Sequence, residues 1–144
     1  MVVDGATHGQ ARAVMAFVDA FNAGDLARAM AAFGPRPAVS DCDYRAVRAV
    51  EFTGRAEVAR WLRDRFADHD HLTVSRIFNE TKARRVVGVE WAGRASDTLA
   101  SLGFPHGIQP ALAAKVVFTS YGRIFTFANG PVGGSSDFCR PGAA

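Results

Sequence analysis

Two carboxylates stand close together in the stretch Val-Ser-Asp-Cys-Asp-Tyr, residues 39–44. In an extended strand successive side chains point to opposite faces, so Asp41 and Asp43 share a face with Val39 while Cys42 lies on the other. Two neighbouring carboxylates in a dry site push one pKa up, which leaves one protonated and one ionised acid for general acid–base chemistry. The stretch therefore predicts either a wet strand face or an acid–base site in a pocket.

Asp41 is the first candidate for a catalytic residue. If it faces an apolar cavity, desolvation raises its pKa and makes it a stronger base, suited to moving a proton at a carbon next to a carbonyl group. The alternative is an exposed strand residue paired with Arg36 or Arg45. For Asp43 the alternative is a solvated place at the strand end or a role in the turn that follows.

Three further residues are candidates for binding. His106, in Phe-Pro-His-Gly, could assist proton transfer from a loop, or it could stand exposed at the turn. Trp91 lies in the middle of a predicted strand, where it forms either a pocket wall or part of the core, and the core is favoured. Asn129 ends the last predicted strand, so its amide either reaches a pocket mouth or closes the strand.

The sequence offers no pattern for a metal or a cofactor. His69 and His71 flank Asp70, but consecutive positions at a helix end face different ways. There is no glycine-rich phosphate loop, no Gly-x-Ser-x-Gly motif and no nucleophilic cysteine with an obvious partner. We therefore expect no metal site and no cofactor.

Composition favours one globular domain. The chain has 144 residues, of which 49% are hydrophobic and 22% charged, so a real core is expected. The net charge of +3 comes from arginines spread along the chain, which favours a solvated surface over nucleic-acid binding. Cys42 and Cys139 are too few for a disulfide framework. With no signal-peptide pattern and no apolar run of the roughly 20 residues that span a membrane, we expect a cytoplasmic protein without membrane contact.

Helical patterns dominate the first half. A capping box at Thr7 begins a helix that ends near residues 22–24. Asp25 is a good N-cap for a second helix, whose apolar face includes Phe33 and which the glycine and prolines that follow bring to an end. Thr53 can cap a third helix, whose apolar face is typical of a helix lying on a sheet.

The hydrophobic period then changes from 3.6 to 2. Strands are predicted at residues 38–44, 47–52, 72–79, 83–94, 111–120 and 123–129. A helical turn at 96–102 lies within a long loop at 95–110 that is more often functional or mobile than idle. Helices followed by a largely antiparallel sheet make an α+β fold. Residues 1–130 form the single domain, and the Gly/Ser/Pro-rich tail at 131–144 is predicted to be poorly ordered.

The order of these elements, together with three motifs, resembles the NTF2-like superfamily. The motifs are FVDAFNAGDLARAMAAF at 17–33, FTGRAEVARWLRDRF at 52–66 and FTSYGRIFTF at 118–127. In this order they cover about residues 10–130. The resemblance implies an NTF2-like cone, in which three N-terminal helices pack on a strongly bent, mostly antiparallel sheet that encloses a pocket. It also implies a homodimer formed through the exposed sheet face.

Within the superfamily the motifs are most similar to the SnoaL-like and ketosteroid isomerase-like branch. That resemblance implies a catalytic aspartate at Asp41. The isomerases' oxyanion tyrosine falls on Phe17, which would line the binding pocket, and their protonated aspartate falls near Ala114. Neither residue can donate a hydrogen bond, which argues against steroid isomerisation itself. The epoxide-hydrolase branch uses an Asp–Arg–Asp set, for which Arg94 and Asp97 offer the residue types without a convincing register.

The function implied is a SnoaL-like protein that binds a small apolar or polycyclic molecule. It would use Asp41 as the general base of a cofactor-free isomerase, cyclase or dehydratase. The alternative is a non-catalytic ligand-binding or protein-interaction module of the same fold. Fold alone does not decide between them.

Overall fold

The computed structural model describes residues 1–43, 48–79, 83–101 and 112–131. In chain order the elements are β1 (Val2–Asp4), α1 (His8–Asn22), α2 (Leu26–Ala31), β2 (Phe33–Asp43), β3 (Arg48–Thr53), α3 (Gly54–Ala67), β4 (His71–Phe78), β5 (Val86–Ala95), α4 (Asp97–Ser101), β6 (Leu112–Phe118) and β7 (Ile124–Pro131). The predicted α+β class is confirmed. The predictions for His106, for most of the loop and for the tail beyond residue 131 lie outside the described residues.

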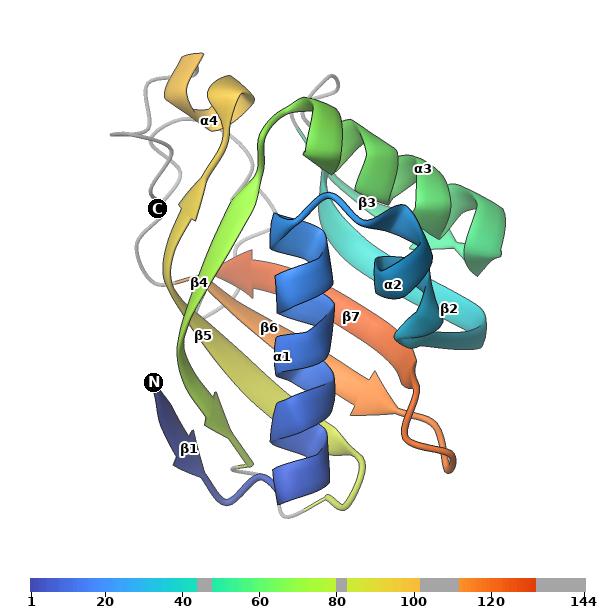
Figure 1. Ribbon diagram of the computed structural model, residues 1–144, viewed down its shortest axis with the longest axis vertical. Coiled ribbons are helices and arrows are strands. Elements are labelled where there is room, and N and C mark those ends of the chain that lie inside the picture. The colour runs from blue at the N-terminus through green and yellow to red at the C-terminus, as the bar shows by residue number, and fades with distance from the viewer. Residues whose placement is uncertain (44–47, 80–82, 102–111, 132–144) are drawn as a thin grey trace.

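The strands form one mixed sheet in the order β1-β4-β5-β6-β7-β2-β3. The pairings of β1 with β4 and of β2 with β7 are parallel, and the others are antiparallel. Figure 1 shows that the sheet is bent and that α1 runs across one of its faces, with α2 and α3 beside it. The helices therefore cover one face of the sheet, and the core lies between the helices and that face.

The helix starts follow the local sequence signals. Thr7 and Gln10 form the predicted capping box, with Thr7 Oγ1 accepting from the Gln10 N–H at 3.1 Å and Gln10 Oε1 accepting from the Thr7 N–H at 2.9 Å. Asp25 caps α2 through its carboxylate. Thr53 is the N-cap residue of α3, but its side chain makes no capping bond, and its N–H donates instead to Glu57 Oε2 at 2.6 Å.

The start of β2 corrects the prediction for the second helix. Phe33 belongs to β2 and pairs with Ile124 of β7, whereas the sequence pattern placed it on the helix. The next pair in this ladder begins at Ala38, so the register shifts in between. Pro35 and Pro37 lie in this irregularity, where their missing N–H groups remove no ladder hydrogen bond. The prolines therefore mark a bulge in a strand and not a helix end.

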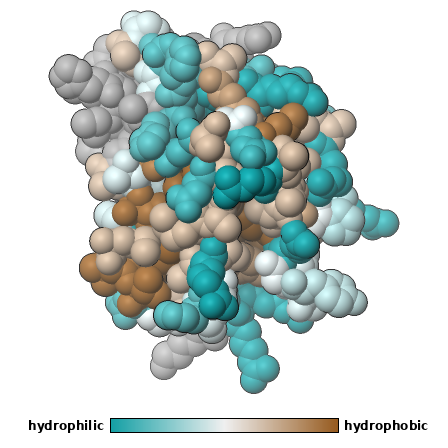
Figure 2. Space-filling view, in the orientation of Figure 1, coloured by the Kyte–Doolittle hydropathy of each residue, from teal (hydrophilic) through white to brown (hydrophobic). Residues whose placement is uncertain are grey.

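The strand β1 is an edge strand that the sequence pattern did not reveal. Its three residues are too few for a period to appear. Arg76 of β4 holds it through an ion pair with Asp4 at 2.9 Å. Met1, Val2 and Val3 are exposed, and the brown patch at the lower left of Figure 2 lies where Figure 1 places this strand.

Aromatic rings fill the core between α1, α3 and the sheet. Phe17 packs against the rings of Phe21, Phe33 and Phe127, with centroids 5.4–5.9 Å apart. Trp61 of α3 packs on Phe127 from another side at 5.9 Å. Each such buried ring contributes about 1.5–3 kcal/mol to stability. None of the helices in the described part of the chain is long and apolar enough to cross a membrane.

Candidate functional site

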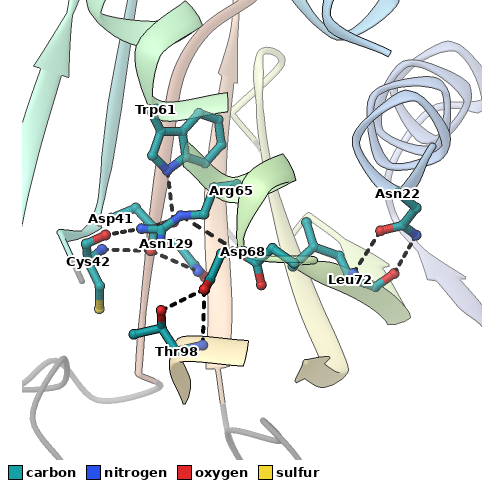
Figure 3. Close-up of polar contacts among 10 residues, drawn as sticks. Asn22, Asp41, Cys42, Trp61, Arg65, Asp68, Leu72, Thr98 and Asn129 are labelled. Atoms are coloured by element: carbon teal, nitrogen blue, oxygen red, sulfur yellow. Dashed lines mark hydrogen bonds and ion pairs between the residues drawn. The ribbon is translucent and has the colours of Figure 1, made fainter. Parts of the chain in front are cut away.

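Asp41 lies buried on β2 with 1% of its surface exposed. Its Oδ1 accepts hydrogen bonds from the Cys42 N–H at 2.8 Å and from Asn129 Nδ2 at 3.4 Å, and its Oδ2 accepts from Trp61 Nε1 at 3.1 Å. Arg65 Nη2 lies 3.5 Å from the same Oδ2 and completes an ion pair (Figure 3). Four donors thus converge on one carboxylate, which favours its ionised form.

The alternative interpretation, in which Asp41 is an exposed strand residue, is therefore wrong. Alternation along β2 places Asp41 on the same face as Val39, as the sequence predicts, and in the structure that face is the inner one. The cation that neutralises Asp41 comes from α3 and not from Arg36.

Arg65 is the central residue that the sequence analysis missed. It is 3% exposed, and it also lies 3.6 Å from Asp70 Oδ2 through Nε and donates to the Cys42 carbonyl through Nη2. Buried charges persist when they are paired, so Arg65 is held between two buried carboxylates. A signal was present, because Arg65 follows Trp61 by four residues and therefore lies on the inward stripe of α3.

Asn129 connects a second tryptophan to this group. Its Oδ1 accepts from Trp91 Nε1 at 3.0 Å, while its Nδ2 donates to Asp41. Asn129 and Trp91 are 6% and 4% exposed, so both lie in the interior. We call the connected buried residues the Asp41 cluster, which consists of Asp41, Trp61, Arg65, Asp70, Trp91 and Asn129.

A cavity of about 220 Å³ opens beside the Asp41 cluster. Its walls come from the C-terminal half of α3, the ends of β2 and β3, and α4. We call it the α3 cavity. Its lining includes the aromatic rings of Phe52 and Trp61 and the carboxylates Asp43, Asp64 and Asp68. Asp43, one of the predicted binding residues, therefore lies at a cavity wall.

Asp41 itself does not line the α3 cavity. Trp61 and Arg65 do, and both also contact Asp41. These two side chains therefore form the wall that separates the Asp41 carboxylate from the cavity. A molecule in the cavity would touch the partners of Asp41 before it touched Asp41.

The short helix α4 is fastened to the end of α3 at the rim of this cavity. Asp68 Oδ1 accepts from the Thr98 N–H at 3.1 Å and from Thr98 Oγ1 at 2.6 Å, as Figure 3 shows, and the Asp68 carbonyl accepts from the Asp97 N–H at 3.0 Å. On the surface His69 Nδ1 lies 2.7 Å from Asp97 Oδ2. This hydrogen bond, and the negative charge of Asp97, raise the pKa of His69 above its ordinary value.

The histidines do not form a metal site within the described residues. His69 pairs with Asp97, Asp70 is buried against Arg65, and His71 stands exposed at the start of β4. No group of three potential ligands gathers in the part of the chain that the structure describes.

The remaining predicted positions fall in the core. Phe17 packs among phenylalanine rings and does not line the α3 cavity. Ala114, on β6, pairs across the sheet with Asn129 of β7. The side chain of Ala114 cannot donate a hydrogen bond, but its partner across the sheet, Asn129, carries a polar amide side chain. Asp97 is engaged by His69, and the side chain of Arg94 is outside the described residues.

Cys42 is disulfide-bonded. The cysteines therefore give no support to the expected cytoplasmic location. The thiol is also unavailable as a nucleophile while this bond is intact.

Asn22 makes a contact that the sequence did not reveal. It ends α1, and its side chain clamps the backbone of Leu72 on β4, donating to the carbonyl at 2.9 Å and accepting from the N–H at 2.8 Å (Figure 3). From local pattern alone, residues 22–24 predict the end of the helix. In the structure the first of these residues also joins the helix to the sheet.

No protein-family model matches the sequence, and no curated protein matches it. Solved structures resemble it instead. A putative polyketide cyclase from Sinorhizobium meliloti superposes with a TM-score of 0.63 and 16% identity, over 83% of this chain and 94% of that one. An NTF2-like protein of unknown function from Cytophaga hutchinsonii gives 0.62 and 12%, over 84% and 88%. The chain has the NTF2-like fold.

A third solved structure of similar fold belongs to an enzyme with a stated role. The epoxide hydrolase/cyclase-like enzyme SalBIII, from pyran ring formation in the polyether salinomycin, superposes with a TM-score of 0.63 and 12% identity, over 83% of this chain and 88% of that one. At identities this low, structural similarity establishes a shared fold but does not establish a shared chemistry. Function has to be argued from the site itself.

Proposed function

We propose that this NTF2-like protein binds a small molecule in the α3 cavity. The observation that carries the proposal is the lining, which combines two aromatic rings with a few polar side chains from several elements, the usual composition of a ligand pocket. Its volume of about 220 Å³ is below the roughly 300–1,000 Å³ of sites for drug-sized ligands. The ligand is therefore a compound of about one ring, smaller than the polycyclic molecule that the sequence resemblance implies.

The charged residues that line the α3 cavity narrow the class of ligand further. Three carboxylates line the α3 cavity, and one of them, Asp64, lies 3.8 Å from the exposed guanidinium of Arg60. The guanidinium of Arg65 is already engaged by Asp41 and Asp70. The lining therefore holds three carboxylates and one guanidinium that is already engaged, a balance that favours a neutral or cationic ligand over an anion.

Two substitutions on α3 test this proposal. Ala67 is exposed and lines the α3 cavity, whereas Ala56 is exposed on the same helix and does not. Binding of phenol, followed by NMR, should weaken about tenfold or more in Ala67→Phe, a change of about 1.4 kcal/mol. Ala56→Phe should bind phenol as the unaltered protein does, and benzoate should bind more weakly than phenol. Equal losses in both variants, or no saturable phenol binding, would contradict the proposal.

Proton transfer by Asp41 is a second candidate function. It is favoured by the position of Asp41 directly behind Trp61 and Arg65, which both line the cavity. A base must come within hydrogen-bond reach of the proton that it removes. Catalysis by Asp41 therefore requires Trp61 or Arg65 to give way to the substrate.

A minimal reaction tests this candidate. If Asp41 is a base, the protein should accelerate exchange of the α-hydrogens of cyclohexanone with deuterium, and Asp41→Asn should lower the rate by about 10²-fold or more. Phenol binding should be retained in this variant, which shows that the cavity is intact. An exchange rate equal to that of buffer would leave the protein as a binding module, the alternative function.

We also propose that the protein forms a homodimer through the outer sheet face. Phe125 of β7 is 47% exposed, whereas Ile124 and Phe127 of the same strand are buried. Sedimentation should give twice the 15.4 kDa mass of one chain, and Phe125→Ser should shift it towards the single mass. A single-chain mass for the unaltered protein would overturn this proposal.

A further inference from the structure

Two clefts adjoin at the start of α1, at the opposite end of the molecule from α4 in Figure 1. One of about 280 Å³ lies between α1, the end of α2 and the turn from β6 to β7. The other, of about 220 Å³, lies between α1, the segment before β5 and the same turn. They share Ala13 and Gly122. We call the pair the arginine clefts.

Four arginines line these clefts, and none of the carboxylates in the described ranges does. Arg28 and Arg123 line the first cleft, and Arg84 and Arg85 line the second. Among the described residues none of the four is paired with a carboxylate. Within the described part of the chain, one of the four guanidiniums makes a hydrogen bond, from Arg123 to the Ala31 carbonyl, a neutral acceptor.

The fold gathers these charges from separate parts of the chain. Along the sequence the arginines look evenly spread, but the strand connections and α2 bring residues 28, 84–85 and 123 to one end of the sheet. Gathering cations without counter-charges creates a positive potential, which concave walls focus. A potential of this kind attracts anions.

We propose that the arginine clefts bind a small organic anion that carries phosphate groups. The planar guanidinium matches phosphate oxygens in a bidentate way, and four of them can serve more oxygen atoms than one carboxylate offers. The hydroxyls of Thr119 and Ser120 line the second cleft and can donate to the same oxygens. The alanines and glycines of the lining leave room for the ligand. This site is separate from the α3 cavity and does not depend on the function proposed there.

Pyrophosphate is the probe for this site. Isothermal titration at low salt should show saturable binding, which Arg84→Gln and Arg123→Gln should each weaken about tenfold. Arg63→Gln, which removes one exposed positive charge from α3, is the matched control and should have little effect. All these positions are exposed, so the variants should fold, as circular dichroism can confirm. Affinity should fall as salt rises from about 50 to 200 mM, because the contacts are charge contacts.

Three results would overturn the proposal. The first is absence of saturable pyrophosphate binding at low salt. The second is an equal loss in Arg63→Gln and in the cleft variants, which would indicate attraction to net charge alone. The third is tighter binding of citrate than of pyrophosphate, which would exclude phosphate as the preferred group.

Discussion

The Asp41 cluster and the arginine clefts use arginine in opposite ways. Arg65 is 3% exposed and lies between Asp41 and Asp70, whereas Arg84 and Arg85 are exposed and have no carboxylate partner among the described residues. A buried charge must be paired for the protein to fold, so removing it affects stability. An exposed and unpaired charge contributes little to stability and is available to a ligand. Burial, and not residue type, decides which role an arginine has.

The largest expected effect is that of Arg65→Met. The substitution keeps an unbranched apolar stem but removes the guanidinium that pairs with the buried carboxylates of Asp41 and Asp70, which costs about 3–5 kcal/mol of the free energy of unfolding. Arg84→Gln, its counterpart in the arginine clefts, should change this quantity by no more than about 0.5 kcal/mol. Urea unfolding measures both. A loss in Arg65→Met of less than about 1 kcal/mol, the size of an exposed ion pair, would erase the contrast between the two regions.

Asn22→Ala should have an intermediate effect. It removes the clamp on Leu72 and leaves a partly buried N–H and carbonyl of β4 without partners, at a cost of about 1–3 kcal/mol. Asp19→Ala, at an exposed position of the same helix, is the control for altered helix propensity. Similar losses in the two variants would mean that the clamp does not stabilise the fold. The loss in Asn22→Ala can then be compared with the loss in Arg65→Met, which sets the contribution of a neutral polar contact beside that of a buried ion pair.

The smallest effect concerns the exposed pair of His69 and Asp97. Because folding raises the pKa of His69, the stabilising contribution is fully present below the unfolded pKa of about 6.5 and is lost as pH rises through the folded pKa. The difference in stability between the unaltered protein and His69→Asn should therefore be larger near about pH 5.5 than near about pH 8.5. Thermal unfolding at both pH values measures it. A difference that grows with pH would show that the pair acts in the opposite sense.

Local signals in the sequence predicted the elements well. Thr7, Asp25 and Thr53 marked helix starts, because a cap involves residues only three or four positions apart. Strand alternation placed Asp41 on one face with Val39 for the same reason, but it did not decide whether that face was buried. Phe33 was wrongly assigned to the helix because its strand begins with a proline-rich bulge. The bulge interrupts the alternation of buried and exposed residues that would have indicated a strand.

Long-range partners could not be predicted in the same way. Arg65 pairs with a residue 24 positions earlier, and no local pattern indicates which carboxylate a helix will face. The arginine clefts depend on three distant segments that meet only in the folded sheet. The resemblance to the NTF2-like superfamily gave the fold but not these contacts, since residues of this kind differ between proteins that share a fold.

The two tryptophans allow the most direct test of ligand binding in the α3 cavity. Both indole N–H groups donate into the Asp41 cluster, but of the two only Trp61 lines the cavity. In an NMR titration with phenol, the indole Nε1–H signal of Trp61 should shift in a saturable way, while that of Trp91 should move much less. Trp91→Phe assigns the two signals. A shift confined to Trp91, or no shift in either signal, would contradict ligand binding in the α3 cavity.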